Sequence, residues 1–495
     1  MSEEIDLPEQ MQVRRDKRQR LLATGKEPYP LKVPQTHLLA QIVAEHDAQA
    51  MGPDVQTGQI VSVSARVIFI RDTGKLVFAR LREGDGTEIQ AMLSAAEVGE
   101  AALTEFKEFV DLGDHVSITG EVITSKRGEL SVKASAWQMA AKTLRPLPVE
   151  HKPLSDEARS RMRYVDLIVR PKAREMVRLK AAVLKSLRKT LDEYGYIEVD
   201  TPTLQYTNGG AAARPFNTHV NAFDVDMLLR IAIELHLKRG LVGGIDRVYE
   251  IGKTFRNEGV DNTHNPEFMM LEAYYAYGDY ETMAEQTQKM IVDAARAANA
   301  TTIEGRDGNP IDLLGEWRHA SLAELVSEVV GEQVDHNTEL TVMKNIAANN
   351  DVPVREGWDS GEILLELFEK LVEHTLLQPT FVRDYPESVR PLAKKHRSKE
   401  GVVEAWDLII NGVELAAAYS ELNDPVIQRE RLEAQSLLAA AGDPEAMDVD
   451  EDFLRALEFG MPPAGGVGIG IDRLVMLLGE VGIREAILFP LSRPE

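Results

Sequence analysis

A polar stretch between two apolar runs, Phe255–Phe268 (FRNEGVDNTHNPEF), constrains the fold more than any other feature. The flanking runs RVYEIGKT and MMLEAYYAY have strand composition, so the stretch is predicted to be the loop of a hairpin. Alternation along a strand puts Arg256 with Glu258 on one face, and Phe268 with Met270, Glu272 and Tyr274 on one face. A buried face carrying such charges needs a charged group between them. The hairpin is therefore interpreted as a binding site, with a salt-bridged surface hairpin as the alternative.

The residue types in this stretch favour a phosphate-bearing ligand. Arg256 can hold a phosphate or a carboxylate through two parallel hydrogen bonds. A histidine in the loop, His264, can reach a further phosphate, and the ring of Phe268 can lie against a base. The pattern predicts a nucleotide site.

A second hairpin is predicted in WDLIINGVELAAAYSELND, where Asn411-Gly412 between apolar runs favours a type I′ turn. Regular pairing sets Ile409 opposite Glu414 and places Asp407, Ile409, Glu414 and Ala416 on one face. Two carboxylates on one face of a central hairpin suit Mg²⁺ bound to phosphate oxygens. Glu421 would turn to the other face unless a β-bulge intervenes.

A third element, PPAGGVGIGIDRLVMLL, is a glycine-rich strand followed by a helix that opens at Asp472-Arg473. Glycines such as Gly470 let the backbone approach a ligand closely, and Arg473 can reach a terminal phosphate. A dinucleotide fingerprint would need glycine where Ile471 stands, and the lysine-containing phosphate loop of nucleotide hydrolases is absent.

Short β-rich runs from Gly58 to Trp137 predict five strands, which fit an oligonucleotide-binding (OB) barrel better than an immunoglobulin sandwich. Phe78 shares a face with Arg80 in LVFARL, and Gln90 shares a face with Glu88 and Met92 in EIQAML. An aromatic ring beside a cation and an amide can stack on and hydrogen-bond unpaired bases. The alternative is a core Phe78 with solvated neighbours.

Bulk composition bounds the class of protein. The chain has 495 residues, a net charge of −24 and no cysteine, which excludes disulfides, thiolate zinc sites and a cysteine nucleophile. It has no apolar run long enough to cross a membrane and no apolar signal segment at its N-terminus, so a cytoplasmic location is expected. The basic run RRDKRQR at Arg14–Arg20 is by itself more typical of a solvated helix face.

The predicted organisation has three parts: an N-terminal helical extension at 1–57, the barrel at 58–145, and a larger domain at 155–495. A proline-punctuated linker, Leu144–Ser155, separates the last two. Beyond it, apolar residues at helical spacing predict a long helix ending near Gly195, followed by a strand that stops at Thr201-Pro202. Residues of about 280–400 are predicted to be mostly helical.

Three elements occur in order: the strand ending in Pro202, FRNE…H…F…E, and GVGIGIDR. They resemble motifs 1, 2 and 3 of the class II aminoacyl-tRNA synthetases, and their detail is similar to the bacterial-type lysyl-tRNA synthetases of class IIb. The resemblance extends over nearly the whole chain and includes RRDKRQRLLATGKEPYP, the run from Gly209 to Arg239, and YSELNDP. It implies an α+β fold: an antiparallel catalytic sheet flanked by helices, preceded by an all-β OB barrel that reads the anticodon.

The resemblance also implies a function. Lysine attacks the α-phosphorus of ATP to give lysyl-adenylate and pyrophosphate, and the lysyl group then passes to the 3′ end of tRNA(Lys). The implied cofactor is Mg²⁺, and the implied assembly is a homodimer formed through motif 1. The basic N-terminal helix then becomes a tRNA contact.

Residue roles follow from the resemblance. Arg256 would hold the α-phosphate and the lysine carboxylate, and Arg473, with Gly470 beside it, would cover adenine and reach the γ-phosphate. For ATP, adenine would contact Glu258 and Phe268, the outer phosphates would contact His264, and Mg²⁺ would be bound by Asp407 and Glu414. For lysine, the α-amino group would contact Gly210 and Glu234, and the ε-ammonium would contact Glu272, Tyr274 and Glu421. In the barrel, the anticodon would be read by Arg66, Phe78 and Gln90.

Three positions depart from the family pattern. Ala417 stands where an asparagine often contacts the substrate carboxylate, Thr263 where an arginine often contacts phosphate, and Asp407 where glutamate is common. These departures leave open a paralogue with altered amino-acid preference or lower activity. A separate hypothesis is a synthetase-like ligase with an acceptor other than tRNA, which is disfavoured because such a protein usually lacks the OB domain. A third hypothesis, an inactive tRNA-binding protein, is disfavoured because Arg256, Arg473 and the metal carboxylates are present.

Overall fold

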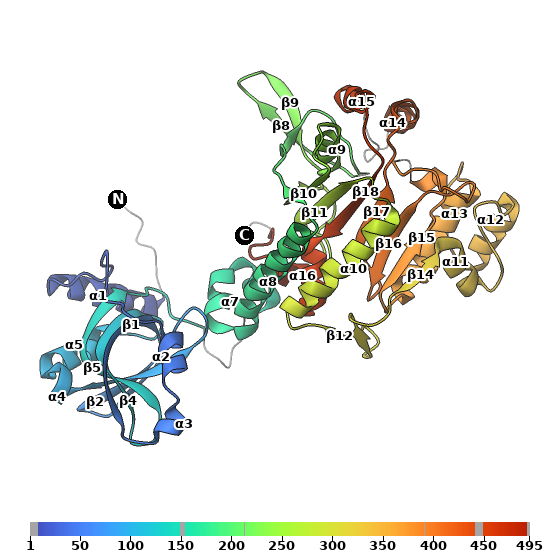
Figure 1. Ribbon diagram of the computed structural model, residues 1–495. Coiled ribbons are helices and arrows are strands. Elements are labelled where there is room, and N and C mark those ends of the chain that lie inside the picture. The colour runs from blue at the N-terminus through green and yellow to red at the C-terminus, as the bar shows by residue number, and fades with distance from the viewer. Residues whose placement is uncertain (1–7, 149–153, 212, 391, 441–448, 493–495) are drawn as a thin grey trace. The chain divides into compact units, whose positions relative to one another are not determined.

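A computed structural model describes residues 8–148, 154–211, 213–390, 392–440 and 449–492 (Figure 1). The chain forms two compact units, Met1–Arg174 and Glu175–Glu495. The predicted linker lies partly outside the described residues, and the division between the units falls within a helix, α8 (Pro171–Glu193). The predicted domain limits 1–57, 58–145 and 155–495 therefore stay a prediction.

The first unit contains a closed barrel, as the β-rich pattern predicts. Its strands follow the order β1-β2-β3-β5-β4. Inward residues of β2, such as Val77, Ala79 and Leu81, are completely buried because every second side chain turns to the barrel interior. The strand bounds are β1 Gln56–Asp72, β2 Leu76–Arg82, β3 Glu88–Ser94, β4 His115–Thr124 and β5 Leu130–Ala141.

Helices of the first unit extend the barrel core. Leu21 of α1 and Leu39 and Ile42 of α2 are buried in the same hydrophobic cluster as the barrel interior. Trp137 of β5 packs edge-on against Phe106, with ring centroids 5.2 Å apart. The helices are α1 Glu9–Ala23, α2 Leu39–Glu45, α3 Ala48–Met51, α4 Ala95–Val98, α5 Glu100–Phe109, α6 Asp156–Arg161 and α7 Arg163–Val169.

The second unit is built on an eight-stranded sheet of order β14-β15-β16-β17-β18-β11-β10-β6. Its inner pairings are antiparallel, and the two outermost pairings, β14 with β15 and β6 with β10, are parallel. This confirms the predicted α+β class with an antiparallel sheet. The strands are β6 Ile197–Glu198, β10 Arg247–Phe255, β11 Glu267–Ala276, β14 Arg318–Ser321, β15 Thr380–Arg383, β16 Ala405–Ile410, β17 Val413–Ser420 and β18 Ala464–Gly470.

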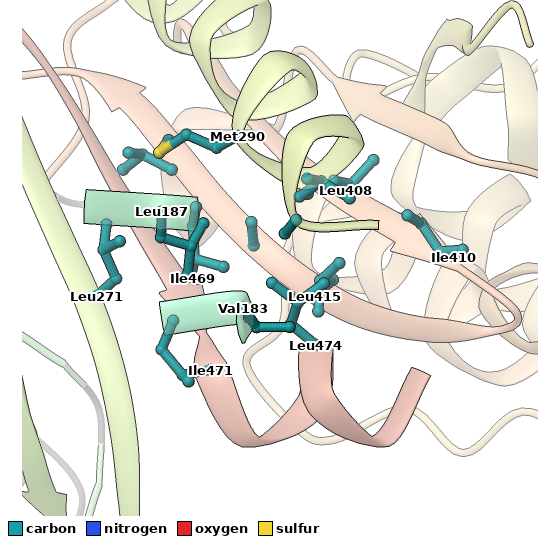
Figure 2. Close-up of a cluster of buried hydrophobic side chains, with 14 of the residues drawn as sticks. Val183, Leu187, Leu271, Met290, Leu408, Ile410, Leu415, Ile469, Ile471 and Leu474 are labelled. Atoms are coloured by element: carbon teal, nitrogen blue, oxygen red, sulfur yellow. The ribbon is translucent and has the colours of Figure 1, made fainter. Parts of the chain in front are cut away.

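One face of this sheet packs against α8, α10 (Tyr280–Ala297) and α16 (Ile471–Gly479). Figure 2 shows the contact, with Val183 and Leu187 of α8 close to Ile469 and Leu474. The long helix predicted after the linker is thus present, and its apolar stripe is buried against the sheet.

Smaller elements complete the second unit. The segment of about 280–400, which the sequence predicts to be mostly helical, contains helices but also supplies β14 and β15 of the main sheet, which the prediction missed. Short strands are β7 Leu204–Gln205, β8 Phe216–Val220, β9 Val225–Leu229, β12 Thr302–Glu304 and β13 Pro310–Asp312. The remaining helices are α9 Glu234–Val242, α11 Leu322–Val330, α12 Leu340–Asn349, α13 Ser360–Leu367, α14 Pro425–Ala440, α15 Glu451–Glu458 and α17 Ile483–Ala486, with helical turns at Phe368–Val372, Glu373–Thr375 and Glu387–Val389.

Candidate active site

A cavity of about 480 Å³ lies on the opposite face of the sheet from α8, α10 and α16. Strand alternation divides β11 between the two faces: Leu271 and Ala273 are buried in the helix-covered core, while Glu272 and Tyr274 line the cavity. The predicted site residues that line it are Gly210, Glu234, Arg256, Glu258, His264, Phe268, Glu272, Tyr274, Glu414, Glu421, Gly470 and Arg473.

The polar stretch is the loop of a hairpin, as predicted. Strand β10 pairs with β11 up to Phe255 and Glu267, and Arg256 N–H still donates to the carbonyl of Pro266 at 2.9 Å. The Arg256 guanidinium lies 5.2 Å from the Phe268 ring centroid, and its buried Nε has no hydrogen-bond partner in the part of the chain that the structure describes. Burial lowers the pKa of Arg256, and Glu258 opposes that effect. An unpaired guanidinium facing a cavity suits an anionic ligand.

Asp261 organises the loop around His264. The Asp261 carboxylate accepts hydrogen bonds from the backbone N–H of Thr263 at 2.6 Å and from its hydroxyl at 2.9 Å. His264 Nδ1 lies 2.9 Å from the same carboxylate. These contacts hold the pKa of Asp261 well below its usual range, the Thr263 N–H being the first cause. Thr263, which departs from the family pattern, therefore stabilises the loop that carries His264.

The second hairpin has the predicted turn but an irregular register. Asn411 and Gly412 both have positive φ, 54° and 66°, as a type I′ turn requires. Ile409 pairs with Glu414, as predicted, but Leu408 pairs with Ala416, so Leu415 is an extra residue in β17. The predicted placement of Ala416 beside Glu414 is wrong, because this β-bulge turns Ala416 to the helix-covered core.

The same bulge turns the second half of β17 toward the cavity. Ala417, Tyr419 and Glu421 line the cavity together with Glu414. Strand alternation left two options for Glu421: the opposite face of the strand, or the face of Glu414 if a β-bulge intervenes. The structure shows the second option.

Glu414 lines the cavity, whereas Asp407, whose charge acts on Glu414, is not among the described residues that line it. Asp407 is buried, and Arg390 Nη2 donates to its Oδ2 at 2.5 Å. Its other oxygen, Oδ1, is buried with no hydrogen-bond partner among the described residues. Desolvation raises the pKa of Glu414, and the charge of Asp407 adds to that rise. Arg390 thus pairs with one oxygen of Asp407 and leaves the other oxygen unsatisfied. The carboxylate oxygens of Asp407 and Glu414 are ligands that fit a hard cation.

The other end of the cavity is rich in buried carboxylates, Glu234, Glu272 and Glu421. Glu272 Oε1 accepts from the backbone N–H of Ile233 at 2.8 Å, and the Tyr274 hydroxyl donates to its Oε2 at 3.3 Å. Burial raises the pKa of Glu272 to about 7 and that of Glu421 to about 7. Buried carboxylates at this density favour a cationic ligand.

Gly210 and Arg473 mark two further points on the cavity wall. Gly210 has φ of +84°, and a Cβ there would lie 3.1 Å from Ala232 Cβ, so a side chain would be strained. Gly470 precedes α16, whose first turn carries Arg473. Arg473 Nη1 donates to the Glu414 carbonyl at 2.7 Å.

The three barrel residues lie on strands of the first unit. Phe78 and Gln90 turn outward, because their neighbours Val77, Ala79, Ile89 and Ala91 fill the interior. Arg71 stacks on Phe78, 4.6 Å from its ring centroid. Arg66 donates to the Gly113 carbonyl at 2.7 Å, and burial lowers its pKa. A core position for Phe78 is therefore wrong.

Three residues at the cavity were missed from sequence. Arg390 and Tyr419 line it, and Lys238 lies behind Glu234 and Glu421. Lys238 follows Glu234 by one helical turn, which is a visible signal, whereas Arg390 comes from an irregular segment with no periodicity to place it.

Across the described residues, every helix falls short of the length and apolarity that a membrane crossing demands.

Comparisons with known proteins agree with this arrangement. The family model described as tRNA synthetases class II (D, K and N) matches residues 155–493, and the model described as OB-fold nucleic acid binding domain matches residues 41–140.

Named relatives match nearly the whole chain. The chain is 52% identical over 491 residues to a lysine–tRNA ligase of Mycolicibacterium gilvum (strain PYR-GCK), covering 99% of this chain and 98% of that protein. It is 51% identical over 496 residues to a lysine–tRNA ligase of Mycobacterium tuberculosis (strain ATCC 25177 / H37Ra), with the same coverage, 99% and 98%.

A third relative is larger. The lysylphosphatidylglycerol biosynthesis bifunctional protein LysX of Mycobacterium marinum (strain ATCC BAA-535 / M) is 48% identical over 494 residues, which cover 99% of this chain and 44% of that protein. The match to the class II model over residues 155–493 and the identity to relatives along the whole chain show that this chain belongs to the class II tRNA synthetases of the D, K and N group.

Proposed function

We propose that this chain is a lysine–tRNA ligase that activates L-lysine with ATP and transfers it to tRNA(Lys). The observation that carries the proposal is one cavity with two chemically different ends. One end presents Arg256, Phe268 and Arg473, and the other presents the buried carboxylates of Glu234, Glu272 and Glu421.

The basic end suits ATP. Arg256, with its unsatisfied Nε, would bind the α-phosphate and the lysine carboxylate and so bring the two reacting groups together. Phe268 would stack on adenine, with Glu258 at its edge, and Arg473 beside Gly470 would cover the other face and reach the γ-phosphate. His264 would bind the outer phosphates. No protein nucleophile is needed, because positioning and charge stabilisation at phosphorus account for adenylate formation.

The acidic end suits lysine. Glu234 and the Gly210 carbonyl would hold the α-ammonium, and Glu272, Tyr274 and Glu421 would surround the ε-ammonium. An uncharged side chain would leave these buried carboxylates without a partner, which is costly, so neutral amino acids are rejected.

Asp407 and Glu414 would hold Mg²⁺, because Asp407 has an unsatisfied buried oxygen, and desolvation together with the charge of Asp407 raises the pKa of Glu414. Within the described residues, no group of three or more histidine, aspartate or glutamate side chains is placed to hold a metal, so phosphate oxygens and water would complete the coordination. Bound there, Mg²⁺ would neutralise phosphate charge.

Transfer to tRNA involves the barrel. Arg66, Phe78 and Gln90 would read the anticodon, with Phe78 stacking on a base.

The test is charging of tRNA with labelled lysine: purified chain, ATP and Mg²⁺ should attach lysine to tRNA(Lys) and not to a transcript with a changed anticodon. Activation of lysine without transfer to tRNA would contradict the proposal.

A second candidate is activation of lysine for another acceptor. The similarity to the LysX protein, which spans 99% of this chain, favours it. It predicts lysine-dependent pyrophosphate exchange with weak charging of every tRNA.

We also propose that the chain forms a homodimer through motif 1 and acts in the cytoplasm, where tRNA is charged for translation. Large apolar side chains are exposed along this region, including Val177 of α8 and Ile197 of β6 at the sheet edge, 42% and 57% exposed. Such exposed residues at a sheet edge favour a partner surface. Light scattering of the purified chain should give about twice 55.0 kDa; a monomer mass would contradict the proposal.

A further inference from the structure

One lysine of the second unit is completely enclosed. Lys238 has no exposed surface and lies on α9, one helical turn after Glu234. Its Nζ lies 2.5 Å from Glu234 Oε1 and 2.5 Å from Glu421 Oε2. Removing an ammonium from water is strongly unfavourable unless it is paired, so this side chain is held by both carboxylates.

Lys238 lies behind the cavity wall. Glu234 and Glu421 both line the cavity, whereas Lys238 contacts them from the protein interior. The Tyr274 ring is 6.0 Å from its ammonium. The second oxygen of Glu421, Oε1, lies over Gly466, where an added Cβ would be only 2.0 Å away. Lys238 thus occupies one oxygen of Glu421 and leaves the other to the cavity side.

The charges at this end of the cavity do not balance without a ligand. Three carboxylates, those of Glu234, Glu272 and Glu421, gather there, and Lys238 supplies one positive charge to them. A substrate with an α-ammonium and an ε-ammonium brings two more positive charges. Arg256 is then free for the substrate carboxylate. With all three carboxylates ionised, the two ammonium groups of a diamino acid make the set neutral.

We infer that Lys238 is a positioning residue for amino-acid selection, which fixes Glu234 and Glu421 so that each directs one carboxylate oxygen to an ammonium group of the substrate. This inference rests on the proposed lysine activation and adds to it a residue that does not touch the substrate.

The electrostatics of the cluster support this role. Burial alone would lower the pKa of Lys238, but Glu234 and Glu421 more than offset it and raise that pKa above its usual range. The pKa of Glu421 is raised to about 7 by burial even with Lys238 beside it. Without the ammonium, Glu421 would be held protonated at neutral pH and would lose its attraction for a cation.

The first test is Lys238→Met, which keeps a similar volume without the charge. In lysine-dependent pyrophosphate exchange, the lysine KM should rise at least about tenfold while the ATP KM changes less than about twofold. The rise should shrink at higher pH, as Glu421 ionises again.

The charged and titratable groups facing Glu421 are Glu234 and Lys238 of α9, Glu272 and Tyr274 of β11, and Tyr419 of β17.

Chemical rescue separates charge from shape. Lys238→Ala leaves a space that propylammonium matches atom for atom, and added propylammonium should lower the lysine KM of this variant. Its uncharged analogue 1-propanol should not. Adding the same two compounds to the wild-type chain measures how far each of them competes with lysine at the substrate site.

A matched control is Lys289→Met on α10, where an exposed lysine pairs with Asp293 at 2.6 Å; both KM values should stay unchanged. A lysine KM in Lys238→Met within about twofold of wild type, or equal rises for lysine and ATP, would overturn the inference. So would loss of folded protein in both Lys238 variants without recovery in propylammonium. A wild-type chain without lysine-dependent exchange would instead contradict the proposed function.

Discussion

Asp407 lies opposite Ala417 across the β16–β17 hairpin, although regular pairing from the Asn411-Gly412 turn would set it opposite Ala416. The difference is one extra residue, Leu415, in β17. This bulge keeps Glu414 on the cavity side and also turns Ala417 and Glu421 there. Glu414, which we propose to bind Mg²⁺, and Glu421, which we propose to bind lysine, therefore face the same cavity.

The position of Ala417 leads to a prediction about lysine binding. It lines the cavity, where an asparagine amide could donate to the substrate carboxylate that we propose Arg256 to bind. Ala417→Asn should lower the lysine KM about tenfold or more, since a hydrogen bond to a charged group stabilises by about 1.5–3 kcal/mol. The measurement is lysine-dependent pyrophosphate exchange. Ala417→Leu, similar in size but without a donor, is the control, and an unchanged or higher KM in Ala417→Asn would refute the placement.

Gly466 and Gly468 of β18 form a matched pair. A Cβ on Gly466 would lie 2.0 Å from Glu421 Oε1 and 2.5 Å from Tyr274 Cε1, whereas a Cβ on Gly468 would lie 3.3 Å from the terminal methyl of Met270. Gly466→Ala should therefore displace Glu421 and raise the lysine KM at least about tenfold. Gly468→Ala should have a clearly smaller effect, because a flexible methionine can move. Equal effects of the two substitutions on the lysine KM would contradict this geometry.

Lysine binding should depend on pH through Glu272. Its pKa is raised from 4.5 to about 7 by burial, with the Ile233 N–H opposing that rise and Glu234 adding to it. The folded chain binds this proton more tightly than the unfolded chain, so the stabilisation is fully present below pH 4.5 and is lost as pH rises through about 7. Lysine needs the ionised form, so its KM should fall between about pH 6 and about pH 8.

Two measurements check this prediction. The free energy of unfolding without lysine should fall as pH rises through the same range, and added lysine should raise the melting temperature more at the higher pH. Glu272→Gln should remove its part of the pH dependence. A lysine KM that is flat across the range would show that Glu272 does not face the ε-ammonium.

The barrel should affect transfer but not activation. Phe78 lies outward on β2 with Arg71 against its ring, so Phe78→Ala removes a stacking surface without opening the core. Charging efficiency with tRNA(Lys) should fall about tenfold, in line with about 1–3 kcal/mol per stacked base, while pyrophosphate exchange is unchanged. Ile60→Ala, at a β1 position that is 63% exposed, is the control. Equal loss of both activities would indicate destabilisation instead.

The sequence predicts the barrel strands, the motif hairpins and the long helix after the linker, because each has a local signal. Asn411-Gly412 specifies its turn by positive φ, and the alternation through Glu272 and Tyr274 assigns their face. The bulge at Leu415 has no such signal. It follows from pairing with both neighbouring strands, so the position of Ala416 was wrong and that of Glu421 was left open.

Long-range contacts account for the rest. Strands β14 and β15 are short and pair with each other in parallel from distant segments, which no local pattern reveals. Arg390 reaches Asp407 from an irregular segment, and Lys238 becomes significant only because Glu421 lies against it. When charged residues are neighbours in space but not in sequence, their interaction can be interpreted only once the fold is known.

The central claim is that a cavity with three buried carboxylates selects lysine for activation by ATP. The most direct test is amino-acid-dependent ATP–pyrophosphate exchange with each of the twenty amino acids. Exchange should be strong with lysine and at least about a hundredfold weaker with lysine-free preparations of every other amino acid, including arginine. No exchange with lysine, or equal exchange with a neutral amino acid, would contradict the account.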